Sequence, residues 1–181
     1  MSGTGSEGLA LPQLDPAPRI LLVVAPYYAQ IAAWQRAGAR AALAAAGAEP
    51  QEIAVPGALE IPPAIRLASA SGRFDGYVAL GCVIRGETTH YETVCEESAR
   101  GLTLLGIERG LCIGNGILTC ESLAQAEERA DPARQDKAGG AALAALHLVA
   151  LARRFGPGPD STGAPAEPDI LLAGGGLSRT A

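Results

Sequence analysis

Short apolar runs alternate with longer helical patterns along the middle of this 181-residue chain, and this alternation limits its fold most strongly. Residues 19–25 and 74–83 are almost continuously apolar and rich in Leu, Ile and Val. Strands without apolar–polar alternation are typical of a parallel sheet that helices cover on both faces. We therefore predict an α/β fold, a small doubly wound α-β-α sandwich with a four-stranded parallel sheet.

The pattern also gives approximate bounds for each element. Strands are predicted at residues 19–25, 51–55, 74–83 and 111–118, and helices at residues 30–46, 60–70, 90–109, 121–130 and 136–155. Residues 1–18 are predicted to be a flexible N-terminal segment, and the Gly- and Pro-rich residues 156–181 a disordered tail. A single domain of residues 19–155 remains between them.

The composition disfavours several classes of protein. A net charge of −5 without any Lys/Arg-rich block argues against nucleic-acid binding. The N-terminus lacks the basic and apolar regions of a secretory signal, and the apolar runs are interrupted before they reach a membrane span. The four cysteines show no zinc-ligand spacing, so we predict free thiols in a cytoplasmic protein and no metal site.

In a doubly wound sheet, ligands bind beyond the carboxyl ends of the strands, so these ends hold the candidate site residues. Tyr27 and Tyr28 follow the first predicted strand, where they either stack on a planar ring or cap the sheet edge. Pro56 and Gly57 predict a tight turn after the second strand. Glu60 follows this turn and either accepts hydrogen bonds from ligand hydroxyls or lies on the surface.

The third strand ends in the most informative segment, residues 81–92. Thr89 and Glu92 have the spacing of a capping box, which predicts a helix start there. Backbone N–H groups and the positive end of the helix dipole then face one spot beside Arg85. His90 lies in this first turn, where a neutral imidazole can exchange protons near pH 7. The segment predicts an anion site next to a proton carrier.

The remaining candidates are weaker. Residues 114–119 contain two glycines but lack the third glycine of a dinucleotide-binding fingerprint. Arg129 either complements the dipole at the end of its helix or reaches the anion site of another subunit. The residues alone do not decide between these two roles.

Taken together, these segments resemble the 6,7-dimethyl-8-ribityllumazine synthase family, from about Arg19 to Phe155. The resemblance rests on VPGALEIP (55–62), GCVIRGETTHY (81–91), NGILT (115–119), QAEERA (125–130) and Lys137. It implies a flavodoxin-like sandwich that condenses 5-amino-6-(D-ribitylamino)uracil with 3,4-dihydroxy-2-butanone 4-phosphate. Phosphate and water leave, and no metal or organic cofactor takes part.

The resemblance also implies roles for individual residues. His90 is expected to carry protons during imine formation and phosphate elimination, and Tyr27 to stack on the pyrimidine. Glu60 is expected to bind the ribityl hydroxyls, and Glu87 and Thr88 to bind the phosphate. Arg129 from a neighbouring subunit is expected to close the phosphate site, which leaves Arg85 a structural or peripheral role. The other expected substrate-binding residues are Ala58, Leu59, Cys82, Val83, Ile84, Asn115 and Lys137.

Family members form pentamers with active sites between subunits, and some assemble into shells of sixty subunits. Residues 131–136 lack the Gly-Lys-rich turn that accompanies shells, so we expect a pentamer, alone or paired. Two other functions stay open: a non-catalytic protein that binds flavin or lumazine in the same pocket, and a shell protein.

Overall fold

The computed structural model describes residues 9–156, and within them four parallel strands form one sheet in the order β2-β1-β3-β4. The strands are β1 (Ile20–Val24), β2 (Gln51–Ala54), β3 (Gly76–Ile84) and β4 (Ile113–Cys120). The helices are α1 (Ala29–Ala45), α2 (Ile61–Ser69), α3 (His90–Arg109), α4 (Leu123–Ala130) and α5 (Lys137–Phe155), with a 3₁₀ turn, η1 (Ala58–Glu60), before α2. The α/β sandwich predicted from the sequence is confirmed, and its strand order is that of the first four flavodoxin strands.

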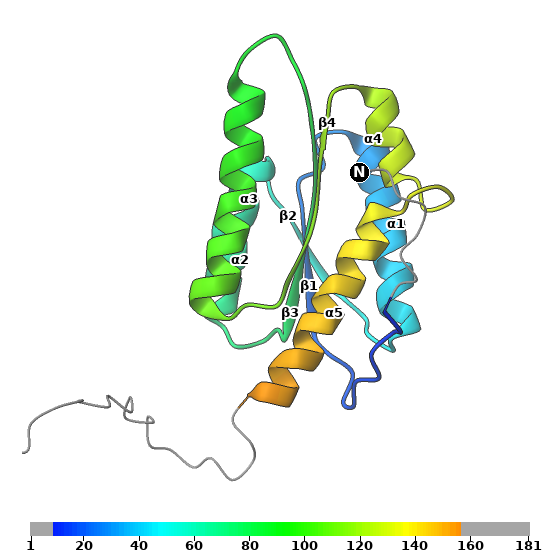
Figure 1. Ribbon diagram of the computed structural model, residues 1–181, viewed down its shortest axis with the longest axis vertical. Coiled ribbons are helices and arrows are strands. Elements are labelled where there is room, and N and C mark those ends of the chain that lie inside the picture. Colours follow the sequence, from blue (N-terminus) through cyan, green and yellow to red (C-terminus); the bar gives the residue numbers. More distant parts are fainter. Residues whose placement is uncertain (1–8, 157–181) are drawn as a thin grey trace, which may run out of the picture.

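The five helices form two layers, one on each face of the sheet (Figure 1). Helices α2 and α3 cover one face, and α1, α4 and α5 cover the other. β1 contributes alternate residues to both faces, and all five are buried. This burial on two faces explains why the strand reads as one continuous apolar run.

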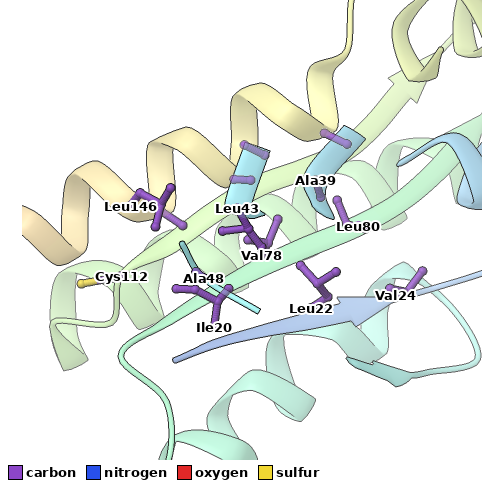
Figure 2. Packing of buried hydrophobic residues seen from close by; sticks show 14 of the residues in the cluster. Ile20, Leu22, Val24, Ala39, Leu43, Ala48, Val78, Leu80, Cys112 and Leu146 are labelled. Atoms are coloured by element: carbon purple, nitrogen blue, oxygen red, sulfur yellow. The ribbon is translucent and has the colours of Figure 1, made fainter. Parts of the chain in front are cut away.

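The largest core cluster lies between the sheet and helices α1 and α5 (Figure 2). Ile20, Leu22 and Val24 of β1 lie beside Val78 and Leu80 of β3, under side chains of the two helices. Phe and Trp are absent from this cluster of described residues, so small aliphatic side chains fill it. Leu43 of α1 and Leu146 of α5 supply its largest helical side chains.

Helix α5 lies unusually close to β4. A Cβ atom added to Gly114 would lie 1.9 Å from the carbonyl oxygen of Ala141 on α5. Gly116 is also enclosed, with the nearest atom 2.9 Å from the position of a Cβ. The two glycines that resemble part of a nucleotide fingerprint therefore allow helix packing in this fold.

α5 is also an exception to the expectation that no apolar segment reaches the length of a membrane span. With 19 residues and a mean hydropathy of 1.2, it is long and apolar enough to cross a membrane by length and composition. Seven of its residues are buried in the protein, among them Ala142, Leu146 and Val149. A core helix has the same apolar character, and the packing against the sheet accounts for it here.

The segment before β1 packs against the body of the protein at Leu11 and beyond. Leu11 and Leu14 pack on the cluster between the sheet and α5, and Arg153 of α5 donates a hydrogen bond to the carbonyl oxygen of Pro16 at 2.7 Å. The division into a flexible segment (1–18), a domain (19–155) and a disordered tail (156–181) stays a prediction. Residues 1–8 and 157–181 lie outside the described residues.

Candidate active site at the carboxyl edge of the sheet

A cleft of about 420 Å³ opens at the carboxyl ends of β1, β2 and β3. β1 and β3 are neighbours, but the chain leaves β1 toward β2 and only later forms β3. The cleft therefore lies at the topological switch point, where doubly wound sheets bind ligands. Its lining residues are Ala25, Tyr27, Tyr28, Pro56, Gly57, Ala58, Leu59, Glu60, Cys82, Val83, Ile84, His90 and Val94.

Eight residues that the sequence predicts for the site line this cleft together: Tyr27, Ala58, Leu59, Glu60, Cys82, Val83, Ile84 and His90. Asn115, Arg129 and Lys137 lie outside its lining. Glu87 and Thr88 also lie outside it, in the exposed loop that leads to His90. The structure thus brings the residues expected on the pyrimidine side together with the expected proton carrier.

The lining includes five residues that the predicted site lacks: Ala25, Tyr28, Pro56, Gly57 and Val94. The first four lie in the segments that follow β1 and β2, and the strand-end rule already points to Tyr28, Pro56 and Gly57 in the sequence. Val94 lies four residues after His90 on α3 and therefore projects from the same face of the helix. Helical spacing is the signal that identifies it.

Tyr27 and Tyr28 differ in their surroundings. The rings meet edge to face with centroids 5.1 Å apart. Tyr28 packs on the small core cluster between α1, α4 and the ends of β3 and β4, whereas Tyr27 is 76% exposed at the cleft. Tyr28 therefore helps to fix the edge of the sheet, and the ring of Tyr27 is accessible to a ligand.

The turn after β2 places a carboxylate at the cleft. Gly57 is extended, and a Cβ added to it would lie 3.0 Å from Oε2 of Glu60. The missing side chain at position 57 thus leaves room for the Glu60 carboxylate. Glu60 ends the 3₁₀ turn η1, and α2 begins at Ile61 with Pro62 in its first turn. The N–H groups of a first helical turn have no partner within the helix, so the missing N–H of proline removes no hydrogen bond there.

Cys82 contributes a neutral thiol to the cleft. Burial, with a smaller effect of Cys120 nearby, raises the pKa of the Cys82 thiol to about 12. A thiol with this pKa stays protonated at neutral pH and is a poor nucleophile. All four cysteines are free, as the sequence predicts. Cys82 therefore shapes the cleft without covalent chemistry of its own.

α3 begins at His90, as predicted, but the prediction of a capping box between Thr89 and Glu92 is wrong. Thr89 has helical backbone angles (φ −68°, ψ 0°), and its side chain accepts no hydrogen bond from the N–H groups at this helix start. The Glu92 carboxylate binds Arg85 instead. The first N–H groups of α3 therefore stay available to an anion beside the cleft.

Arg85 follows β3 directly and binds two carboxylates. Its Nε donates to Glu121 at 2.5 Å, its Nη1 donates to Glu92, and its guanidinium lies 4.2 Å from the centroid of the Tyr91 ring. These hydrogen bonds, to Glu121 first and then to Glu92, raise the pKa of Arg85 above its ordinary value. The ion pairs agree with the structural role expected for Arg85.

Three predicted residues lie on α4, α5 and β4, away from the cleft lining. Arg129 in the last turn of α4 donates a hydrogen bond to the carbonyl oxygen of Gln125 at 3.1 Å, and Lys137 begins α5 with an exposed side chain. Asn115 is exposed and lies within β4, as the third of the eight residues of this strand. Its Oδ1 accepts a hydrogen bond from the backbone N–H of Ile117.

A search of residues 9–156 finds no cluster of three His, Cys, Asp or Glu side chains that could hold a metal ion.

Comparisons with known proteins give one consistent result. The family model described as 6,7-dimethyl-8-ribityllumazine synthase matches residues 17–153. A protein of this name from Jannaschia sp. (strain CCS1) is 50% identical over 175 residues, which cover 97% of this chain and 98% of the relative. Another, from Erythrobacter litoralis (strain HTCC2594), is 56% identical over 138 residues, which cover 76% of this chain and 98% of the relative.

Proposed function

The chain belongs to the 6,7-dimethyl-8-ribityllumazine synthase family, and we propose that it carries out the reaction of this family in the cleft at the switch point of its sheet. The enzyme condenses 5-amino-6-(D-ribitylamino)uracil with 3,4-dihydroxy-2-butanone 4-phosphate. Its products are 6,7-dimethyl-8-ribityllumazine, phosphate and water. The observation that carries the placement is that eight predicted site residues from four separate segments line one cleft.

The pyrimidine substrate binds against the ends of β1 and β3 in this proposal. Tyr27 stacks on the ring, and its exposure at the cleft supports this role. Cys82, Val83 and Ile84 line the opposite side of the ring, largely through backbone atoms. Ala58, Leu59 and Glu60 hold the substrate from the turn after β2, with the Glu60 carboxylate on the ribityl hydroxyls.

The phosphate of the second substrate binds at the start of α3, near Glu87 and Thr88. The uncapped N–H groups of this helix and the positive end of its dipole support an anion at this place. A phosphate bound there lies beside His90, which lines the cleft. His90 carries protons when the amine attacks the ketone and when phosphate leaves, steps that need general acid and base catalysis.

We further propose that each site is completed by a second copy of the chain, with a pentamer as the assembly. Arg129, Lys137 and Asn115 lie away from the cleft of their own subunit, and among residues 9–156 the hydrogen bond of the Arg129 guanidinium goes to a backbone carbonyl and not to a carboxylate. Exposed Leu67 on α2 and Ile107 on α3 supply apolar surface for contact between copies. In a ring, one face of each copy meets a different face of the next, so Arg129 of one subunit serves the cleft of its neighbour.

The cytoplasm is the proposed compartment. Free thiols at all four cysteines support this proposal, because a reducing cytosol keeps thiols in this state.

One assay tests the proposal: both substrates are mixed with the protein, and lumazine fluorescence is followed. His90→Ala is expected to lower kcat without abolishing turnover, because orienting two substrates supplies much of the acceleration. Arg129→Ala is expected to raise KM for the butanone phosphate. Wild-type kcat in His90→Ala would contradict the role of His90, and flavin binding without lumazine formation by the unaltered protein would identify a non-catalytic binder.

A mixing experiment tests the sharing of sites between subunits. His90→Ala and Arg129→Ala chains are unfolded, mixed in equal amounts and refolded together. In a ring, about a quarter of the interfaces then combine an unaltered His90 with an unaltered Arg129, and turnover rises above the mean of the two separate variants. No rise above that mean would show that both residues act within one subunit. Light scattering of the unaltered protein gives the number of subunits.

A further inference from the structure

Arg85 joins three elements at the carboxyl edge of the sheet. Its backbone N–H donates to the carbonyl oxygen of Cys120 at 2.9 Å, which continues the β3–β4 ladder by one residue. Its side chain then reaches Glu92 in the first turn of α3 and Glu121 directly after β4. The loop between β3 and α3 is therefore closed at both ends by the same residue.

Few other contacts hold the start of α3. The fully buried residues of this 20-residue helix are Ser98 and Leu102, both in its middle. His90 is exposed, and Tyr91 and Val94 are only partly buried. The side chain of Thr89, which precedes the helix, makes no capping hydrogen bond. Apolar packing thus fixes the middle of α3 and leaves the direction of its first turn to the Arg85 contacts.

The charges around Arg85 disfavour a role as a phosphate ligand. The carboxylates of Glu92 and Glu121 neutralise the charge of Arg85, so its guanidinium offers no free positive charge to a phosphate. The flat guanidinium also lies over the Tyr91 ring, in the arrangement of a cation–π contact. Its hydrogen-bond donors are directed toward carboxylates of this chain.

We propose that Arg85 is a positioning residue, which orients the first turn of α3, and with it His90 and the phosphate-binding N–H groups, against the end of β3. This inference rests on the proposed function of the cleft. The three side chains of this network are substantially exposed, and ion pairs of this kind add little to stability. Their contribution is geometric, so it affects catalysis far more than it affects the melting temperature.

Three variants test the proposal in the lumazine assay, below the melting temperature of each protein. Arg85→Gln removes the charge and both links, Arg85→Lys keeps the charge but loses the forked geometry, and Glu121→Gln removes one link and leaves Arg85 less neutralised. Arg100→Gln is the matched control, because Arg100 pairs with Glu97 on the same helix without joining two elements. Thermal melts and inhibition by inorganic phosphate are measured for each variant.

The expected result for Arg85→Gln is a loss of about ten- to a hundredfold in kcat, the scale of a 1 Å misplacement of catalytic groups. KM for the pyrimidine and the melting temperature stay close to the wild-type values. Arg85→Lys loses kcat to a similar extent as Arg85→Gln, and Glu121→Gln shows a smaller loss of kcat. The kcat of Arg100→Gln equals that of the wild type.

The change in affinity for inorganic phosphate in Glu121→Gln distinguishes a positioning role of Arg85 from direct phosphate binding. A phosphate ligand freed from Glu121 would bind inorganic phosphate more tightly, and Arg85→Lys would keep that affinity. Either result, or wild-type kcat in Arg85→Gln, overturns the proposal. Absence of turnover in the wild type and Arg100→Gln alike would instead refute the proposed function, and the inference would fall with it.

Discussion

The contact between α5 and β4 leads to a quantitative prediction for Gly114→Ala. The new methyl carbon would lie 1.9 Å from the carbonyl oxygen of Ala141, whereas real Cβ atoms essentially never approach another atom closer than 3.0 Å. A backbone oxygen within a helix cannot swing aside as a flexible side chain does. α5 must therefore move away from the sheet by roughly 1 Å, and a gap of that width forfeits about a quarter to a half of the dispersion energy of the atoms that line it.

This displacement affects the best-packed part of the protein. Ala142, Ala145 and Leu146 of α5 have no exposed surface and belong to the largest core cluster. Overpacking alone costs about 1–3 kcal/mol, and the opened interface adds to this. We expect the free energy of unfolding to fall by about 3 kcal/mol or more, which lowers the melting temperature by roughly 6–12 °C in a protein of this size.

Thermal melts followed by circular dichroism at one fixed protomer concentration measure the effect, since the proposed assembly would make melting depend on concentration. Gly140→Ala is the matched control on the same helix, because a Cβ there meets no atom within 4 Å. It should raise the free energy of unfolding by about 0.5–1 kcal/mol. A melting temperature for Gly114→Ala within about 2 °C of the wild type would refute the argument from close packing.

Three further predictions concern separate parts of the chain. Arg19 donates three hydrogen bonds to Asp75, and the bond from its side chain is the main cause of the lowered pKa of the Asp75 carboxyl. Asp75→Asn should therefore cost about 1–2 kcal/mol in the free energy of unfolding near neutral pH. Because the folded pKa is the lower one, this stabilisation is present above the unfolded pKa and is lost as pH falls through the folded pKa, so urea unfolding should show the two proteins converging in acid. The Asp136 side chain caps α5 by accepting a hydrogen bond from the N–H of Gly139, and the backbone of Asp136 has φ +40°, in the left-handed region. Asp136→Ala should therefore lower the free energy of unfolding by about 2 kcal/mol in the same measurement, while Asp136→Asn stays near the wild type. Tyr27→Ala should raise KM for the pyrimidine by about five- to a hundredfold, with Tyr27→Phe near the wild type, and an unchanged KM in Tyr27→Ala would show that no ring stacks there.

Local sequence patterns predict the elements of this fold well. The bounds of α3 agree with the prediction at both ends, and Gly110 with φ +63° ends the helix in a conformation that glycine adopts without strain. Gly47 follows the end of α1 with φ +71°, a conformation that glycine adopts without strain, and this supports the predicted helix end. The start of α2 is displaced to Ile61 because residues 58–60 form a 3₁₀ turn first.

Contacts between distant residues are what the sequence could not predict. The spacing of Thr89 and Glu92 fits a capping box, but Arg85 competes for the same carboxylate and also binds Glu121, 36 residues away. This pairing becomes visible only when β3 and β4 are aligned. In the same way, the glycines at positions 114 and 116 fit a nucleotide fingerprint only weakly, and their role in packing becomes visible only when α5 is placed on β4.

The position of α5 at the end of the domain has a consequence for synthesis on the ribosome. Every residue that lines the cleft lies between Ala25 and Val94, so the pocket is translated long before the helix that closes the largest core cluster. Until α5 leaves the ribosomal exit tunnel, the apolar side chains of β1 and β3 on that face lack the cover that α5 provides. A nascent chain that stalls before residue 137 therefore exposes an apolar sheet face, to which chaperones and other nascent chains can bind.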